Sequence, residues 1–134
     1  MLNIVFASHG NYAQGIYETM KYFTNELSHI SFVNLEDKSI YDFEEEIDKL
    51  LTQFTGEILV LCDLYQGTPF KTFFSKLYGR KDAAIISNIS FYNALVVSID
   101  KNLSLDDAIK MISNSNQIEI KKMDSIIGLS EEDE

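Results

Sequence analysis

Residues 4–10 read IVFASHG, and this stretch decides the fold because an apolar run stops there at a polar triplet. Apolar runs of this length bounded by glycine are typical of buried β-strands. The residues that follow, 12–27, are predicted to form a helix, since their apolar positions recur at steps of three or four. His9 then lies at the carboxyl end of a strand and beside a helix N-terminus. Ligands bind at that place in open α/β sheets, and helix N-termini favour anions such as phosphate.

The chain has 134 residues, the length of one domain, and its hydrophobic content of 46% and aromatic content of 12% are typical of a globular protein. No apolar run reaches the roughly 18 residues of a membrane span, and no secretory leader precedes the first strand-like segment. We therefore expect a soluble, cytoplasmic protein that does not insert into a membrane. Cys62 is the only cysteine, so no internal disulfide is expected, and its apolar surroundings predict a small buried hydrophobic residue.

The formal net charge is −10, and residues 123–134 form an acidic tail with five acids and no lysine or arginine. This balance argues against binding to nucleic acid, which needs a basic patch. Two interpretations of the acidity remain open. The acidity suits a protein that meets a basic partner surface, since complementary charge speeds encounter. Alternatively, the acidic residues only keep the protein in solution.

Strand and helix patterns alternate along the chain. Apolar or alternating runs predict strands over residues 2–8, 30–35, 57–62, 83–88 and 117–123. Helical periodicity and start signals predict helices over residues 12–27, 40–54, 69–78, 91–99 and 105–114. This order predicts the α/β class, with a doubly wound, mainly parallel sheet and helices on both faces. The segment 117–123 alternates apolar and polar residues, so it is predicted to be a C-terminal edge strand with one exposed face.

Two predicted strand ends carry side chains that could act together, His9 after the first strand and Asp63 after the third. Such ends can be neighbours in a doubly wound sheet. A carboxylate that accepts a hydrogen bond from one imidazole nitrogen orients the ring and leaves the lone pair of the other nitrogen free. Because histidine can be a nucleophile that carries a covalent group, we predict that His9 and Asp63 form a catalytic pair for phosphoryl transfer.

Phosphoryl transfer needs little more from a protein than positioning and donors for the phosphoryl oxygens. We predict that these donors are the backbone N–H groups of Gly10, Asn11 and the Gly67-Thr68 turn, with the Thr68 hydroxyl. Thr68 also suits the N-cap of a helix that starts at Pro69. Taken singly, each of these residues has an ordinary structural explanation as a cap or a turn residue. Together they put a histidine, an aspartate and a Gly-Thr turn on one edge of one sheet.

Other candidate residues are assigned structural roles. His29 precedes the second predicted strand, at the sheet edge opposite the strand carboxyl ends, so it is expected to be solvated. The acidic run 44–46 is expected to form a solvated helix face. The sequence contains no glycine-rich nucleotide-binding motif and no histidine or carboxylate cluster with metal-ligand spacing, so neither a cofactor nor a metal is expected.

Three segments in order resemble the mannose-family IIA domain of the bacterial phosphoenolpyruvate-dependent sugar phosphotransferase system (PTS): residues 4–10 (IVFASHG), 61–70 (LCDLYQGTPF) and 86–89 (ISNI). They are similar to the family's phosphorylation-site strand, to its second active-site loop, and to a strand end whose asparagine lines the site. The likeness covers residues 1–122, which are identified as a PTS IIA domain of the mannose type, and leaves 123–134 as the acidic tail.

The resemblance implies a phosphotransferase component with a phosphohistidine intermediate. His9 would take a phosphoryl group from the phosphocarrier protein HPr and pass it to a IIB domain, which phosphorylates sugar entering through the membrane components IIC and IID. Asp63 would orient His9, Thr68 would bind the phosphoryl group, and Asn88 would line the site. The resemblance also implies a homodimer whose C-terminal strand is exchanged between subunits.

Three positions depart from the family pattern: Gln66 replaces the first of two glycines, Lys71 replaces a common asparagine, and Ser90 replaces a usual proline. Because the histidine and the aspartate are both kept, activity is expected to survive. The alternative is a regulatory or binding module with the same fold, which would sense phosphorylation state or dock a transcriptional or kinase partner. A dihydroxyacetone-kinase phosphodonor domain is a close variant, but its second loop lacks the Gly-Thr-Pro-Phe pattern of residues 67–70.

Overall fold

The centre of the protein is one parallel β-sheet, built from the most apolar segments of the chain. In the computed structural model, which describes residues 1–115 and 118–124, the strands are β1 (Leu2–Ser8), β2 (Ile30–Asn34), β3 (Glu57–Cys62) and β4 (Ala83–Ile86). They pair in the order β2-β1-β3-β4, and every pairing is parallel. β1 and β3 are therefore central and buried on both faces, as their nearly continuous apolar runs predict.

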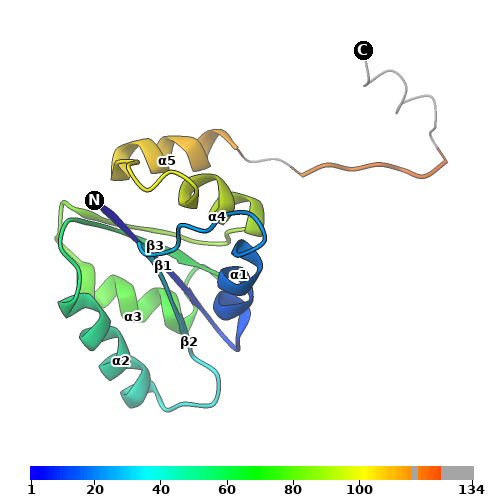
Figure 1. Ribbon diagram of the computed structural model, residues 1–134. Coiled ribbons are helices and arrows are strands. Elements are labelled where there is room, and N and C mark those ends of the chain that lie inside the picture. Colours follow the sequence, from blue (N-terminus) through cyan, green and yellow to red (C-terminus); the bar gives the residue numbers. More distant parts are fainter. Residues whose placement is uncertain (116–117, 125–134) are drawn as a thin grey trace.

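Helices cover both faces of the sheet, which confirms the predicted doubly wound α/β fold (Figure 1). One face carries α2 (Ile40–Thr52) and α3 (Thr68–Leu77), and the other carries α1 (Tyr12–Met20), α4 (Phe91–Ser98) and α5 (Leu105–Asn114). Successive residues of a strand point to opposite faces, so Ile4 and Phe6 enter one core while Val5 and Ala7 enter the other. Among the described residues, no helix is long and apolar enough to cross a membrane.

The first helix is shorter than predicted, because it ends at Met20 and not near residue 27. Just past this end, the Phe23 N–H donates to the Met20 carbonyl at 2.9 Å, an i→i−3 bond that tightens the last turn. The Thr24 hydroxyl then accepts a hydrogen bond from the Glu26 N–H at 3.1 Å. Such a local bond from side chain to backbone competes with helix formation, so the apolar spacing alone overestimated the length of the helix.

His29 is buried, so the prediction that it is solvated is wrong. The residue is 4% exposed, and its Nε2 lies 2.9 Å from the carbonyl oxygen of Ser98 at the end of α4. Leu27, in the same connection between α1 and β2, packs against the core on this face. The connection between α1 and β2 therefore folds against α4. This tertiary contact could not be inferred from the place of His29 in the sequence, just before a strand.

The predicted C-terminal edge strand is not formed over residues 118–123, and residue 117 lies outside the described residues. Residues 125–134 of the predicted acidic tail also lie outside them. The chain at 118–124 runs away from the sheet (Figure 1), and Ile118 and Ile120 are 84% and 82% exposed. A strand needs a neighbour with which to exchange hydrogen bonds, and no described strand lies beside this segment. The outer edge of β4 is likewise unpaired within the described chain.

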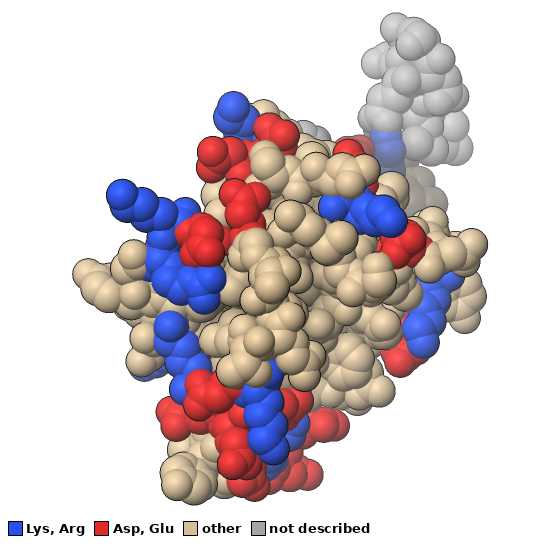
Figure 2. Space-filling view, turned by 60° about the vertical axis from the view of Figure 1, so that its left-hand side comes forward, with Lys and Arg blue, Asp and Glu red and all other residues tan. Residues whose placement is uncertain are grey.

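Acidic and basic side chains are mixed on the surface around α2. Figure 2 shows acidic side chains gathered at the end of the molecule where α2 lies, with basic side chains between them. Lys38 pairs with Glu46 at 2.6 Å, and Lys76 of α3 pairs with Asp48 at 2.8 Å. The acidic run 44–46 therefore belongs to a solvated helix face that is partly ion-paired, which agrees with the prediction for this segment.

We predict that Cys62 does not react with thiol reagents while the protein is folded. Its side chain is fully buried in β3, and burial, with a smaller contribution from the charge of Asp63, raises the pKa of the Cys62 thiol from 9.0 to about 12. Because the thiolate is the reactive species, alkylation by iodoacetamide at pH 8 should occur only when the chain opens. Mass spectrometry with and without denaturant measures this, and rapid stoichiometric alkylation of the native protein would contradict the burial of Cys62.

Candidate active site

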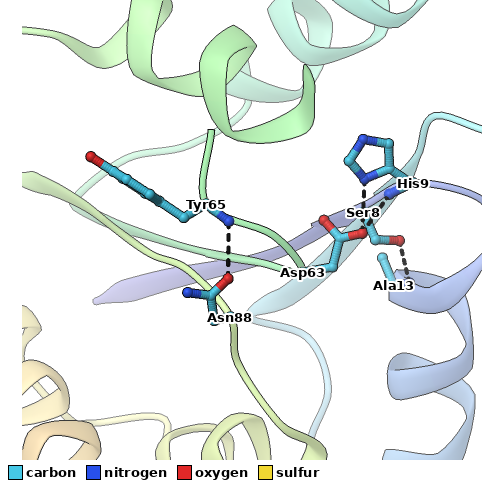
Figure 3. A network of polar contacts seen from close by, with 6 residues as sticks. All are labelled: Ser8, His9, Ala13, Asp63, Tyr65 and Asn88. Carbon is cyan, nitrogen blue, oxygen red and sulfur yellow. Dashed lines mark hydrogen bonds and ion pairs between the residues drawn. The ribbon is translucent and has the colours of Figure 1, made fainter. Parts of the chain in front are cut away.

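Three loops meet at the carboxyl edge of the sheet. The loop after β1 carries His9, the loop after β3 begins with Asp63, and the loop after β4 carries Asn88 (Figure 3). Parallel strands end at the same edge of a sheet, and β1 and β3 are direct neighbours. This topology brings His9 and Asp63 into contact although they are 54 positions apart in the sequence.

Asp63 holds His9 by two contacts to one carboxylate oxygen. The backbone N–H of His9 donates to Asp63 Oδ2 at 3.0 Å, and the ring atom Nδ1 of His9 lies 3.0 Å from the same oxygen (Figure 3). A carboxylate only accepts hydrogen bonds when it is ionised, so this contact assigns the proton of the neutral ring to Nδ1 and the lone pair to Nε2. The His9 side chain is 44% exposed and that of Asp63 only 18%, so the ring is held from inside and open to a partner from outside.

Gly67 lets the imidazole approach the N-terminus of α3 closely. A Cβ atom on Gly67 would lie 2.5 Å from His9 Cε1 and 3.2 Å from His9 Nε2, and the first of these distances is too short for two carbon atoms in non-bonded contact. The absence of a side chain at Gly67 therefore leaves the space that the His9 ring occupies. The nitrogen that carries the lone pair lies next to this helix end.

The N-terminus of α3 lies one residue earlier than predicted. Gly67, with an extended backbone (φ −75°, ψ 172°), is the N-cap, so Thr68 is the first helical residue and Pro69 the second. The prediction that Thr68 is the N-cap is therefore wrong, because an N-cap needs the extended backbone that Gly67 adopts. The first N–H groups of an α-helix have no acceptor within the helix, and this leaves the N–H groups of Thr68 and Phe70 directed out of the end of α3.

The turn after His9 offers a second set of backbone donors. Gly10 adopts a positive φ of 53°, a conformation that glycine takes without strain. The N–H groups of Gly10 and Asn11 donate to no acceptor within the part of the chain that the structure describes. Two groups of unpaired N–H donors are therefore near His9. The group before α1 follows His9 directly in the sequence, and the group at the start of α3 lies next to its ring in space. Their predicted role in binding a phosphoryl group stays a prediction.

Asn88 supports the loop after β3. Its Oδ1 accepts a hydrogen bond from the Tyr65 N–H at 3.0 Å, and Figure 3 shows its amide nitrogen directed away from His9. Its backbone adopts a positive φ of 59°, which asparagine tolerates better than most residues. The contacts of Asn88 thus explain how it positions the loop, while its predicted place in the lining of the phosphoryl site stays a prediction.

Two residues near the site were not predicted from the sequence. The buried Ser8 hydroxyl accepts a hydrogen bond from the Ala13 N–H at 2.6 Å and so caps α1 (Figure 3). The usual capping side chain lies two or three residues before the N–H that it binds, so the five-residue separation of Ser8 and Ala13 gives no recognisable signal. The Tyr12 hydroxyl donates to the Ile89 carbonyl at 3.3 Å. Burial, together with the charge of Asp63, raises the pKa of Tyr12, so this donor stays protonated.

The inner oxygen of the carboxylate is buried. Among the described residues, Asp63 Oδ1 has no hydrogen-bond partner, which leaves Oδ2 to make both contacts with His9. Within the same part of the chain, no group of three or more His, Cys, Asp or Glu side chains is arranged to hold a metal ion. The arrangement is therefore a histidine backed by a carboxylate, with backbone donors beside the free ring nitrogen, and it suits nucleophilic chemistry on an anionic group.

Solved structures share this fold. The chain is similar to the phosphotransferase system component EIIA from Streptococcus agalactiae, with a TM-score of 0.77 and 23% identity over 93% of this chain and 99% of that one. It is also similar to the mannose/sorbose specific IIA subunit of the phosphotransferase system from Enterococcus faecalis, with a TM-score of 0.75 and 16% identity over 90% and 96%. A sigma-54 interaction domain protein from Enterococcus faecalis has a TM-score of 0.69 and 18% identity over 96% and 95%. A comparison with curated protein sequences finds no match.

The family model described as the PTS system fructose IIA component matches residues 3–113. This range includes most of the chain and all three loops of the site. The resemblance seen in the three sequence segments is therefore confirmed, and the chain belongs to the EIIA-man family of PTS IIA components.

Proposed function

We propose that this chain is the phosphoryl carrier of a sugar phosphotransferase system in the cytoplasm. It accepts a phosphoryl group from phospho-HPr on His9 and passes it to a IIB domain, which serves sugar uptake through the membrane components IIC and IID. The observation that carries the proposal is the 3.0 Å contact between His9 Nδ1 and Asp63 Oδ2. This contact leaves Nε2 as the nucleophile, next to a helix N-terminus that favours an anion.

In the first step, the lone pair of His9 Nε2 attacks the phosphorus atom carried by phospho-HPr. A bond forms between Nε2 and phosphorus while the bond from phosphorus to its donor atom on HPr breaks, and the electron pair of the broken bond stays on HPr. The proton on His9 Nδ1 remains in its hydrogen bond with Asp63, whose negative charge stabilises the positive charge that develops on the ring. The second step is the same transfer from His9 to a IIB domain, and it restores the lone pair of Nε2.

The phosphoryl oxygens need donors close to Nε2. In the proposed complex, the N–H groups of Gly10, Gly67 and Thr68 and the Thr68 hydroxyl supply them, and Asn88 lines the far side. The Gly67 N–H donates to the Leu64 carbonyl at 3.2 Å in the free protein, so its use requires a change in that turn, whereas the Thr68 N–H at the helix start is available without one. Backbone donors of this kind stabilise anions without reorganisation of side chains.

A second copy of the chain is the proposed partner in assembly. The segment 117–123 would add to the open outer edge of β4 in the other subunit, which would pair both the edge and the segment. A groove of about 570 Å³ runs beside this edge. Its aromatic lining includes Phe70 and Phe74 of α3 and Tyr78, the residue that follows this helix. The exposed side chains of Ile118 and Ile120 would be buried by such an exchange, which supports a homodimer.

We predict that phosphoenolpyruvate, enzyme I and HPr phosphorylate the purified protein at His9, with an acid-labile bond found by mass mapping. His9→Ala should abolish uptake, and Asp63→Asn should slow it about 10- to 100-fold, since partners that orient a reactive ligand commonly have effects of that size. Circular dichroism of each variant checks that the fold is kept. A folded wild-type protein that takes up no phosphate, or a His9→Ala variant that still does, would contradict the carrier role and favour the regulatory alternative.

Gly67→Ala should slow the same reaction about 100-fold, because displacement of a reacting group by about 1 Å can have that effect. The added methyl group would collide with the His9 ring and push it from Asp63. The substitution should lower the free energy of unfolding by only about 1 kcal/mol, the usual loss at an N-cap.

The matched control is Gly15→Ala, at an exposed helical glycine of α1 whose added Cβ meets no atom within 4 Å. It should stabilise the fold by roughly 0.5–1 kcal/mol and leave phosphoryl transfer unchanged. Transfer by Gly67→Ala at the wild-type rate would show that the close approach of Gly67 to His9 has no role in the reaction.

The exchange of the C-terminal strand predicts a dimer in solution. Sedimentation equilibrium should give a dimer for the wild-type protein and a monomer for the double variant Ile118→Lys and Ile120→Lys, because two charges cannot be buried in an apolar groove without large loss. Glu119→Gln, on the opposite face of the predicted strand, is the control and should remain dimeric. A wild-type protein that is monomeric at high micromolar concentration would exclude the exchange.

A further inference from the structure

One basic residue lies in the segments that form the site. Across residues 8–12, 63–71 and 87–90, Lys71 is the only lysine or arginine. It is exposed in the first turns of α3, and within the described chain it forms no ion pair. By contrast, Lys76, farther along the same helix, pairs with Asp48 at 2.8 Å. A basic residue without a carboxylate partner in the described chain thus belongs to the same set of segments as the candidate nucleophile.

The backbone puts Lys71 directly behind Gly67. The Lys71 N–H donates to the Gly67 carbonyl at 2.9 Å, so the two residues are one helical turn apart on the same face. Helical side chains lean toward the N-terminus and cover the turn that precedes them. Gly67 offers no side chain to this turn, and a Cβ atom added there would meet the ring atoms Cε1 and Nε2 of His9. We therefore infer that the flexible lysine stem can extend toward the side of the imidazole that carries the lone pair.

The helix dipole does not favour a cation near the start of α3. The N-terminus of a helix carries a partial positive charge, which repels a nearby lysine unless an anion offsets it, although the effect weakens beyond the first turn. In the described part of the chain no carboxylate pairs with Lys71. An anionic group bound at the N-terminus of α3 would interact favourably with both the helix dipole and the ammonium group of Lys71.

We propose that Lys71 is a further phosphoryl-binding residue, whose ammonium group pairs with oxygens of the phosphoryl group carried by His9 Nε2. This inference rests on the proposed function and names one more residue of the same site. Lys71 contributes charge alone. The Nε2–phosphorus bond forms and the donor bond breaks as described above, and no proton moves to or from the lysine. By pairing with the transferred group, it favours phosphorylated His9 over the free histidine.

The test compares Lys71→Gln, Lys71→Arg and the control Lys81→Gln with the wild-type protein. Lys81 is also an exposed lysine without an ion pair in the described chain. It precedes β4 and so lies at the amino ends of the strands, opposite the carboxyl ends where His9 lies. Each protein is phosphorylated in two ways, by phosphoramidate, a small donor that needs no docking surface, and by phospho-HPr. The rate of formation of phospho-His9 is measured by mass spectrometry at low and high salt, and thermal unfolding is measured alongside.

With phosphoramidate, Lys71→Gln should react about tenfold more slowly than the wild-type protein, a typical effect for one charge-assisted contact. The difference should shrink at high salt, because an exposed charge is screened. Lys71→Arg should restore most of the rate, Lys81→Gln should match the wild-type protein, and the unfolding temperature of Lys71→Gln should be unchanged or higher.

Four results would overturn the inference. Two concern the rate of phospho-His9 formation by Lys71→Gln: a rate equal to that of the wild-type protein with phosphoramidate, or a reduced rate only with phospho-HPr. The other two are a reduced rate that accompanies lower thermal stability, and a wild-type protein that neither donor phosphorylates. A loss seen only with phospho-HPr would assign Lys71 to protein docking. If wild-type His9 accepts phosphate from phosphoramidate and not from phospho-HPr, the proposed carrier function fails. The phosphoramidate comparison would still decide the role of Lys71 in that case.

Discussion

One oxygen atom organises the carboxyl edge of this protein. Asp63 Oδ2 binds the backbone N–H and the ring Nδ1 of His9, both at 3.0 Å, and so fixes a loop and a side-chain torsion together. The contact depends on the register of the two central strands, which pairs Ala7 with Cys62, so that Asp63 one residue later and His9 two residues later leave the sheet within reach of each other. The other features of the site fit around the ring, since Gly67 leaves it room and α3 begins beside it.

Much of the fold could be predicted from the sequence, because long apolar runs bounded by turn residues specify buried strands and the strand–helix order specifies a parallel sheet. The His9–Asp63 contact followed from the same order. Features that depend on tertiary contacts could not be predicted in this way. The burial of His29 against α4 and the cap that Ser8 provides to α1 have no local pattern. The C-terminal segment has a clear strand pattern, but a strand also needs a neighbour, and among the described residues no strand lies beside this segment.

Two of the three departures that the sequence resemblance indicates lie where the chain changes direction, Gln66 in a turn and Ser90 at the start of α4. Gln66 stands where the family usually has glycine and adopts a positive φ of 68°, which disfavours a residue with a side chain by roughly 1–2 kcal/mol. The substitution therefore stores strain in one turn residue and leaves the adjoining Gly67 in place. Ser90 stands where proline is usual, and it forms a capping box with Asn93 at the start of α4.

A ring held from one side can be approached only from the other. His9 is fixed by Asp63 from within the sheet edge, and its free nitrogen faces the start of α3 and the solvent. In the proposed function, a donor protein and an acceptor protein would have to reach the same phosphorus atom on the exposed side of the ring, so they could not be bound at once. The protein would then work as a shuttle that alternates between partners, each of which competes with the other. The flux through it would depend on the balance of the two partner concentrations as well as on the chemistry of the histidine.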